Sequence, residues 1–233
     1  LERVLPLVKA HGAAVVGITQ DDNGVPCSIE DRVAIAHRIV TACASSVLIG
    51  LARFSRDRVE ANQRLAVEKA VMEVLPIELP PRASSLELHR TFLDKVTGPS
   101  PRSGGAYVLA EGDKVVAYAV PLEGKGYWDT IRGFIGIASD KESVTGISFY
   151  EQQETPGLGA EIAEKPFRSQ FVGKRIAEGD RPVGIRAAGS ALGASEVHAV
   201  TGATQTSTRL EKIINEDLVR WRSALRSTGD LGS

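Results

Sequence analysis

The spacing of hydrophobic and polar positions changes near residue 105 and divides the chain into a helical part and a stranded part. In residues 55–76, apolar positions recur every three or four residues, with charged residues between them, until Pro76. This spacing predicts an amphipathic helix that stops at the proline, because one face of a helix recurs every 3.6 residues. Its apolar face consists of Val67, Val71, Val74 and Leu75.

Short apolar segments between residues 105 and 150 predict four strands. The first two, 105–110 and 114–120, flank Glu-Gly-Asp, which favours a hairpin turn. The next two, 131–138 and 144–150, are separated by a polar segment. Glycines inside them predict bulges or close backbone approach, and these are Gly133, Gly136 and Gly146.

Two helices are predicted after the strands. Residues 164–173 fit a short helix, with Pro166 in its first turn and Gly173 at its end. Residues 207–221 fit a longer helix whose apolar face consists of Leu210, Ile213, Ile214, Leu218 and Trp221. The main body is therefore predicted to be an α+β domain over about 55–225, an antiparallel sheet with flanking helices.

The N-terminal residues predict a separate β-loop-α appendage. Residues 13–18 have the composition of a buried strand, 19–28 form a turn-rich loop, and Ser28 is suited to cap a helix. An uncharged run follows at 39–52. As a helix it would extend about 21 Å at 1.5 Å per residue. By itself it does not span the ~30 Å hydrocarbon core of a membrane.

Composition and charge exclude some classes of function. The chain has 233 residues, of which 42% are hydrophobic and 24% charged, as in an ordinary globular protein. A net charge of −1 gives no electrostatic reason to expect a nucleic acid partner. Cys27 and Cys43 fit no metal-binding spacing, and the four histidines are scattered. These features do not favour a metal site or a hydrolytic triad.

Five hydroxyl side chains surround a Gly-Ala step before the last predicted helix: Thr201, Thr204, Thr206, Ser207 and Thr208. Unpaired N–H groups at a helix N-terminus attract anions, phosphate in particular. The small Gly202 and Ala203 allow a bulky group to approach the backbone. The alternative is structural, because Thr206 or Ser207 is also suited simply to cap the helix.

A second segment with ligand-binding character is 154–162, Glu-Thr-Pro-Gly-Leu-Gly-Ala-Glu-Ile. Its Pro-Gly turn can present backbone N–H groups and the apolar Leu158 to a flat ligand, or it can be an ordinary surface turn. Two further pairs of residues each allow a ligand-binding and a structural interpretation. Tyr127 and Trp128 can stack on such a ligand or pack at a strand entrance. Glu154 and Lys174 can steer the ligand or remain solvated charges.

Taken together, four segments resemble the FMN-binding domain shared by the RnfG subunit of Rnf complexes and the NqrC subunit of sodium-pumping NADH:quinone oxidoreductases. They are 124–137, 154–162, 167–174 and 200–207, and the resemblance extends over about 47–222, with RnfG the closer of the two. It implies the following organisation: a remnant of a membrane anchor and its following helix at 45–76, a connection at 77–104, and the FMN-binding domain at 105–225.

The resemblance implies covalent FMN, joined through a phosphoester to a threonine by a separate flavin transferase. The matching residue is Thr204, and Thr206 is the alternative. The flavin ring would pack on Leu158 and Thr155. The other residues implied at the cofactor are Thr201, Gly202, Ala203, Glu154, Gly157 and Gly159.

The function implied is that of an electron-transfer subunit of a membrane-bound, ion-translocating Rnf-type complex (ferredoxin:NAD), rather than a self-contained enzyme. Its partners would be the other subunits, and its FMN domain would lie on the extracytoplasmic side of the cytoplasmic membrane, held by an N-terminal anchor that is incomplete in this chain. The alternatives are a stand-alone extracytoplasmic flavin-binding domain that serves another reductase, and an unflavinylated assembly module.

Two regions depart from this resemblance. His198 stands where the family usually has an aspartate three residues before the motif, and the lost carboxylate favours slow or absent flavin attachment. Residues 1–44 instead resemble a fragment of the pterin-binding barrel of corrinoid-dependent methyltransferases. A complete barrel takes about 250 residues, so this fragment is too short for a pterin site. The junction indicates a fused or truncated reading frame.

Overall fold

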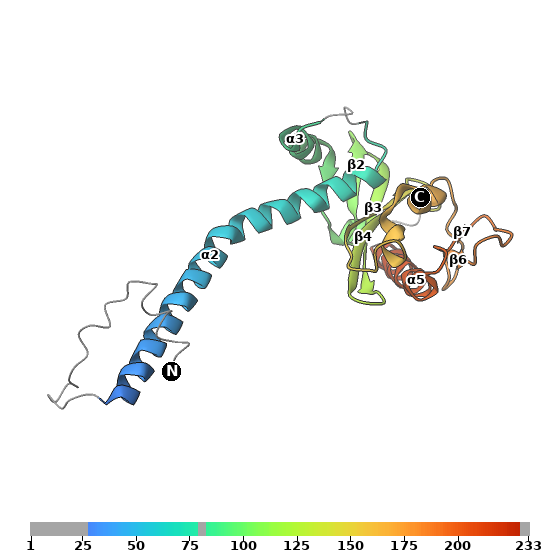
Figure 1. Cartoon of the computed structure of the whole chain (residues 1–233). Coiled ribbons are helices and arrows are strands. Elements are labelled where there is room, and N and C mark those ends of the chain that lie inside the picture. The colour runs from blue at the N-terminus through green and yellow to red at the C-terminus, as the bar shows by residue number, and fades with distance from the viewer. Residues whose placement is uncertain (1–27, 79–82, 229–233) are drawn as a thin grey trace. The chain divides into compact units, whose positions relative to one another are not determined.

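The computed structural model describes residues 28–78 and 83–228, and the chain divides into two compact units, 1–62 and 63–233. Helix α2 (Ile29–Val74) runs through 46 residues (Figure 1). The sequence analysis predicted two helices here, but no proline interrupts this stretch, so the helix is continuous. No helix of the described residues is both long enough and apolar enough to cross a membrane. The predicted strand 13–18 lies outside the described residues.

The unit 63–233 is built on a five-stranded antiparallel sheet, which confirms the predicted fold class and all four predicted strands. The strand order is β1-β2-β3-β4-β5. The strands are β1 (Val96–Thr97), β2 (Tyr107–Glu111), β3 (Lys114–Lys125), β4 (Thr130–Ala138) and β5 (Val144–Glu151). The predicted hairpin joins β2 to β3, with Glu111 paired to Lys114 and Gly112 at φ 61°.

Helices cover both faces of this sheet (Figure 1). Helix α5 (Thr204–Ser227) packs its predicted apolar face on one side, and its five predicted residues are all buried. Alternate strand residues complete this core, among them Tyr118, Val120, Leu122, Ile131, Ile135 and Ile137. The last turns of α2 and the following Leu75 pack on the other side with Ala117, Ala119 and Phe134. Three of the four predicted apolar residues are buried there.

Two glycines that face each other on neighbouring strands allow α2 to approach the sheet closely. Gly136 and Gly146 lie opposite each other on β4 and β5. A Cβ atom on Gly136 would lie 2.2 Å from the Val74 carbonyl oxygen. The Thr145 hydroxyl donates to the same oxygen at 2.5 Å. The predicted bulges are also present, because the register shifts at Arg132/Gly133 and at Gly136/Ile137.

A half-buried ion pair completes this contact. The Glu73 carboxylate accepts a hydrogen bond from the Ser148 hydroxyl at 2.7 Å and one from the Arg168 guanidinium at 2.7 Å. Ser148 is buried on β5, whereas Arg168 comes from the short helix that follows the sheet. Helix α2 therefore ends on the sheet in a defined position.

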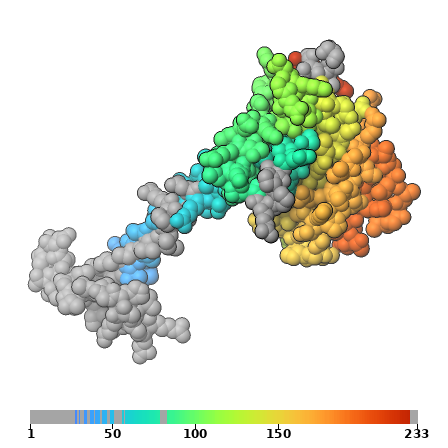
Figure 2. Space-filling model, turned by 90° about the horizontal axis from the view of Figure 1, so that it is seen from above, coloured from blue at the N-terminus to red at the C-terminus, as the bar shows by residue number. Residues whose placement is uncertain are grey.

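Residues 77–104, predicted as a connection, contain regular structure. Helix α3 (Ser85–Lys95) begins with a capping box formed by Ser84 and Glu87. None of its residues is buried, and it lies on the surface of the unit (Figure 2). The His89 ring lies 2.9 Å from the Glu68 carboxylate and links α3 to α2. Strand β1 and the 3-10 helix η1 (Pro101–Ser103) follow.

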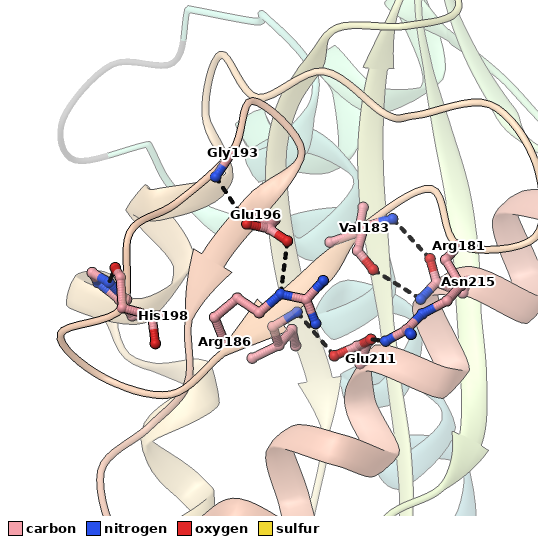
Figure 3. A network of polar contacts seen from close by, with 10 residues as sticks. Arg181, Val183, Arg186, Gly193, Glu196, His198, Glu211 and Asn215 are labelled. Atoms are coloured by element: carbon pink, nitrogen blue, oxygen red, sulfur yellow. Dashed lines mark hydrogen bonds and ion pairs between the residues drawn. The ribbon is translucent and has the colours of Figure 1, made fainter.

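The segment after β5 contains short helices and a small second sheet. The predicted helix 164–173 is present as α4 (Lys165–Arg168) and η3 (Ser169–Phe171), preceded by η2 (Gly159–Ala163). Strands β6 (Gly184–Arg186) and β7 (Glu196–His198) pair in parallel and were missed by the sequence analysis. Two side chains of α5 bind the backbone at the start of β6. Asn215 exchanges two hydrogen bonds with Val183, which directly precedes the strand (Figure 3). Glu211 accepts one from the Ile185 N–H.

The contact at Gly136 predicts the effect of one methyl group. Gly136→Ala places a Cβ against the Val74 carbonyl, so we expect the free energy of unfolding to fall by about 1–3 kcal/mol. Urea denaturation followed by circular dichroism measures this change. Gly98→Ala is the control, because a Cβ there meets nothing within 4 Å. Equal stability of the two variants would contradict the close contact.

The Glu196 carboxylate predicts a pH dependence. It accepts hydrogen bonds from the Gly193 N–H at 2.8 Å and from Arg186 Nε at 2.7 Å (Figure 3). The backbone bond first, and then Arg186, hold the pKa of Glu196 below its ordinary value of 4.5. The folded chain therefore takes up this proton at a lower pH than the unfolded chain does. The stabilisation is complete above the unfolded pKa and is lost as the pH falls through the folded pKa.

We therefore expect Glu196→Gln to lose less thermal stability than the wild type on acidification from neutral pH to about pH 3. Glu111→Gln is the control, because Glu111 is exposed and makes no ion pair within residues 28–78 and 83–228. Thermal unfolding at several pH values measures the difference. Parallel curves for Glu196→Gln and the wild type would show that the Glu196 contacts contribute nothing.

Candidate cofactor-binding site

Three segments that are distant in sequence meet at the N-terminus of α5 and line an open hollow of about 250 Å³. They are the loop between β3 and β4, the Pro-Gly loop after β5, and the Thr-Gly-Ala-Thr turn. The lining residues are Tyr127, Thr155, Leu158, Gly159, Gly202, Ala203, Thr204, Gln205 and Thr206. The two segments that the sequence analysis selected for ligand binding therefore face the same space.

The hydroxyl groups of the Thr-Gly-Ala-Thr segment have different surroundings. Helix α5 begins at Thr204, and its N-cap residue is Ala203, which makes no side-chain cap bond. Thr204 is exposed and lines the hollow. Thr206 is buried, and Ser207 Oγ is buried without a hydrogen-bond partner among the described residues. The alternative in which Thr206 or Ser207 caps the helix is therefore wrong.

Glu154 connects the three segments through one buried carboxylate. One oxygen accepts hydrogen bonds from the Tyr127 N–H at 2.8 Å and the Trp128 N–H at 3.1 Å. The other accepts from the Thr206 hydroxyl at 2.6 Å. Glu154 is 5% exposed, so the reading of this residue as a solvated charge is wrong. Both carboxylate oxygens are occupied inside the protein, and Glu154 therefore positions the walls of the hollow.

Glycines make room for this carboxylate. A Cβ on Gly126 would lie 2.5 Å from Glu154 Oε1, and a Cβ on Gly159 would lie 2.6 Å from Thr206 Oγ1. Gly202 has a φ of +79°, and its Cβ would lie 3.1 Å from Leu158 Cδ2. The first two approaches leave no room for a Cβ atom, and at Gly202 the left-handed φ favours glycine. Leu158 thus lies directly beside the Thr-Gly-Ala-Thr turn.

The aromatic pair lies in the loop between β3 and β4 and remains accessible. Tyr127 is 46% exposed and Trp128 is 62% exposed, so neither ring belongs to the buried core. Their ring centroids are 5.1 Å apart in a T-shaped arrangement. Trp128 Nε1 donates to the Thr155 hydroxyl at 2.9 Å, which joins this loop to the Pro-Gly loop. Tyr127 contributes directly to the wall of the hollow.

Several residues named from the sequence do not line the hollow. Thr201 and Gly157 belong to its turns but do not form its surface, and Lys174 is half-buried elsewhere. His198 ends β7 (Figure 3). Its ring nitrogen lies 2.9 Å from the Ser190 carbonyl. Sequence reasoning missed Gln205, which does line the hollow. The sequence signal that could have identified Gln205 was its position directly after Thr204 at the start of a helix.

These features fit FMN. An accessible hydroxyl stands at a helix N-terminus that no side chain caps, which suits a phosphate group. Leu158 and Tyr127 provide apolar and aromatic surface for a flat ring beside it.

Comparisons with known proteins agree with this geometry. Residues 126–219 match the family model of the FMN-binding domain. The chain is 36% identical over 108 residues to NqrC, a subunit of the Na(+)-translocating NADH-quinone reductase, of Vibrio anguillarum, covering 45% of this chain and 42% of that protein. For NqrC of Pasteurella multocida, the identity is 37% over 119 residues, covering 49% and 46%. The chain thus spans less than half the length of these curated relatives.

Solved structures share the fold. The NqrC structure from Parabacteroides distasonis superposes with a TM-score of 0.59 at 22% identity, covering 72% of this chain and 96% of that one. NqrC of Shewanella oneidensis superposes with a TM-score of 0.61 at 18% identity, covering 72% and 99%.

The contrast between two threonines predicts different roles for their hydroxyls. Thr206→Val leaves one oxygen of the buried Glu154 without its donor, so we expect the free energy of unfolding to fall by about 1–3 kcal/mol. Thr204→Val is the matched control, because it alters an exposed side chain and should change stability by about 0.5 kcal/mol or less. Urea denaturation measures both values. A larger loss for Thr204→Val than for Thr206→Val would contradict this assignment.

Proposed function

We propose that this chain, whose residues 126–219 form an FMN-binding domain of the NqrC and RnfG type, is an electron-transfer subunit of a membrane redox complex. The observation that carries the proposal is the accessible Thr204 hydroxyl, which lines the hollow at the uncapped N-terminus of α5. The matched relatives are named as subunits of a reductase, which supports a carrier that works among other subunits.

In this proposal Thr204 carries the flavin. Its hydroxyl oxygen would bond to the phosphorus of an activated flavin phosphate, a phosphoanhydride. The P–O bond of the anhydride would break, and the second phosphate group would leave with the hydroxyl proton. A separate flavin transferase supplies the flavin and catalyses the step. The burial of Thr206 supports Thr204 over the alternative, because the Thr206 hydroxyl already donates to Glu154.

Bound FMN supplies the redox chemistry, since its ring can accept and release electrons. The residues of this chain would hold and orient it. The first turn of α5 would stabilise the phosphate charge through its N–H groups. Leu158 and Tyr127 would contact the ring, and the Trp128–Thr155 hydrogen bond would fix the wall between the two loops. Glu154 would hold all three segments in place.

We further propose that the complex is of the ion-translocating Rnf or Nqr class. The segment 126–137, Gly-Tyr-Trp-Asp-Thr-Ile-Arg-Gly-Phe-Ile-Gly-Ile, supports the Rnf type, whereas the curated relatives support an Nqr-like complex. The FMN domain would face the extracytoplasmic side of the cytoplasmic membrane, tethered by a segment that precedes it.

An unflavinylated assembly module is the second candidate, and His198 is the observation that favours it. A transferase that recognises a carboxylate at this position would find an imidazole instead. The ring lies beside the Ser190 carbonyl and does not line the hollow, so His198 leaves the FMN-binding surface itself unchanged.

Intact-protein mass spectrometry after coexpression with a flavin transferase tests the proposal. We expect the wild type to gain the mass of one FMN less water and Thr204→Ala to gain none. Thr201→Ala and Thr208→Ala are controls that remove neighbouring exposed hydroxyls, and both should retain the gain. A wild type without added mass would favour the assembly module. A gain that persists in Thr204→Ala would place the attachment at another residue.

A further inference from the structure

One face of α5 lies along the arm of the β3–β4 hairpin and leads into the hollow. Gln205, Arg209 and Ile213 are four residues apart and share this face. A Cβ on Gly124 would lie 2.5 Å from Ile213 Cγ1, so the arm and the helix are in close contact there. One turn closer to the N-terminus, the Arg209 guanidinium carbon lies 5.9 Å from the centroid of the Tyr127 ring. Gln205, one turn further, lines the hollow.

The charge of Arg209 is not neutralised by a carboxylate. Two arginines on or near α5 are paired, Arg181 with Glu211 and Arg220 with Asp217 at 2.7 Å. Arg222 of the same helix instead donates to the Ala177 and Ile176 carbonyls. Within the described part of the chain, Arg209 forms no ion pair and instead packs over the face of Tyr127, a cation–π contact. Since Tyr127 itself lines the hollow, a positive charge lies next to a residue of the wall.

We propose that Arg209 is an electrostatic residue of the flavin site, whose charge favours the reduced flavin and thereby raises its midpoint potential. Reduction adds negative charge to the ring, and a nearby cation stabilises the more negative state. The positive end of the α5 dipole acts in the same direction. This inference rests on the proposed function, because it requires a flavin in the hollow.

The position of Arg209 indicates that its charge acts on the flavin ring and not on the phosphate. The phosphate would be attached at Thr204, the first residue of α5. Arg209 lies five residues further, about 7.5 Å along the helix axis, away from the helix N-terminus. It stands against Tyr127, where the ring would pack.

The test compares midpoint potentials of flavinylated variants by anaerobic spectroelectrochemical titration. We expect Arg209→Gln to have a lower midpoint potential than the wild type, whereas Arg209→Lys, which keeps the charge, stays close to it. Arg226→Gln is the matched control, because it removes one arginine near the other end of the same helix and should leave the potential unchanged. Equal potentials for Arg209→Gln and the wild type would overturn the proposal.

Failure of the proposed function is recognised separately, because the intact mass of each variant reports FMN attachment before any potential is measured. Should no flavin be attached, the same variants are titrated with free FMN and with riboflavin, oxidised and reduced, by tryptophan fluorescence. We expect Arg209→Gln to weaken binding of both reduced flavins several-fold more than that of the oxidised ones. A loss confined to FMN and equal in both redox states would assign the charge to the phosphate and overturn the proposal, as would no loss at all.

Discussion

The buried carboxylate of Glu154 is the constraint on which the site depends. Two backbone N–H groups of the β3–β4 loop and one hydroxyl of α5 converge on it. It has no cationic partner among the described residues, so these three donors must compensate the loss of its hydration. A charged acceptor with several fixed donors holds its surroundings more firmly than apolar contact would. The hollow is therefore a preformed feature of the folded chain.

The sheet makes this convergence possible. Strands β3 and β4 extend to the loop that carries Tyr127 and Trp128, and β5 delivers the Pro-Gly loop to the same end. Helix α5 packs along one face and brings its N-terminus there. The end of α2 packs on the opposite face. The facing Gly136 and Gly146 allow it to approach the sheet closely. Helices on both faces thus prevent the strands from shifting and hold the three loops together.

Local sequence patterns predicted most helices and strands, but few of the contacts between them. Alternation and a Glu-Gly-Asp turn identified the β2–β3 hairpin, and helical spacing identified the buried face of α5. Strands β6 and β7 have three residues each, too few for a recognisable period. They are stabilised by side chains of the distant helix α5, because Asn215 and Glu211 accept hydrogen bonds from the backbone at the start of β6. Helix α3 lies in the segment 77–104, whose proline, arginine and serine content predicted a connection, although Ser84 and Glu87 offered a capping-box signal. The sequence indicated which segments form the site, but the burial of Glu154 depends on Thr206, 52 residues away.

The two threonines at the start of α5 differ by two positions, and a helix turns about 100° per residue. Their hydroxyls consequently point in nearly opposite directions, one toward the protein interior and one toward solvent. In an extended chain both would be equally available to a modifying enzyme. If a transferase attaches the flavin at Thr204, as proposed, only the folded domain distinguishes this hydroxyl from its neighbour, and attachment would then follow folding.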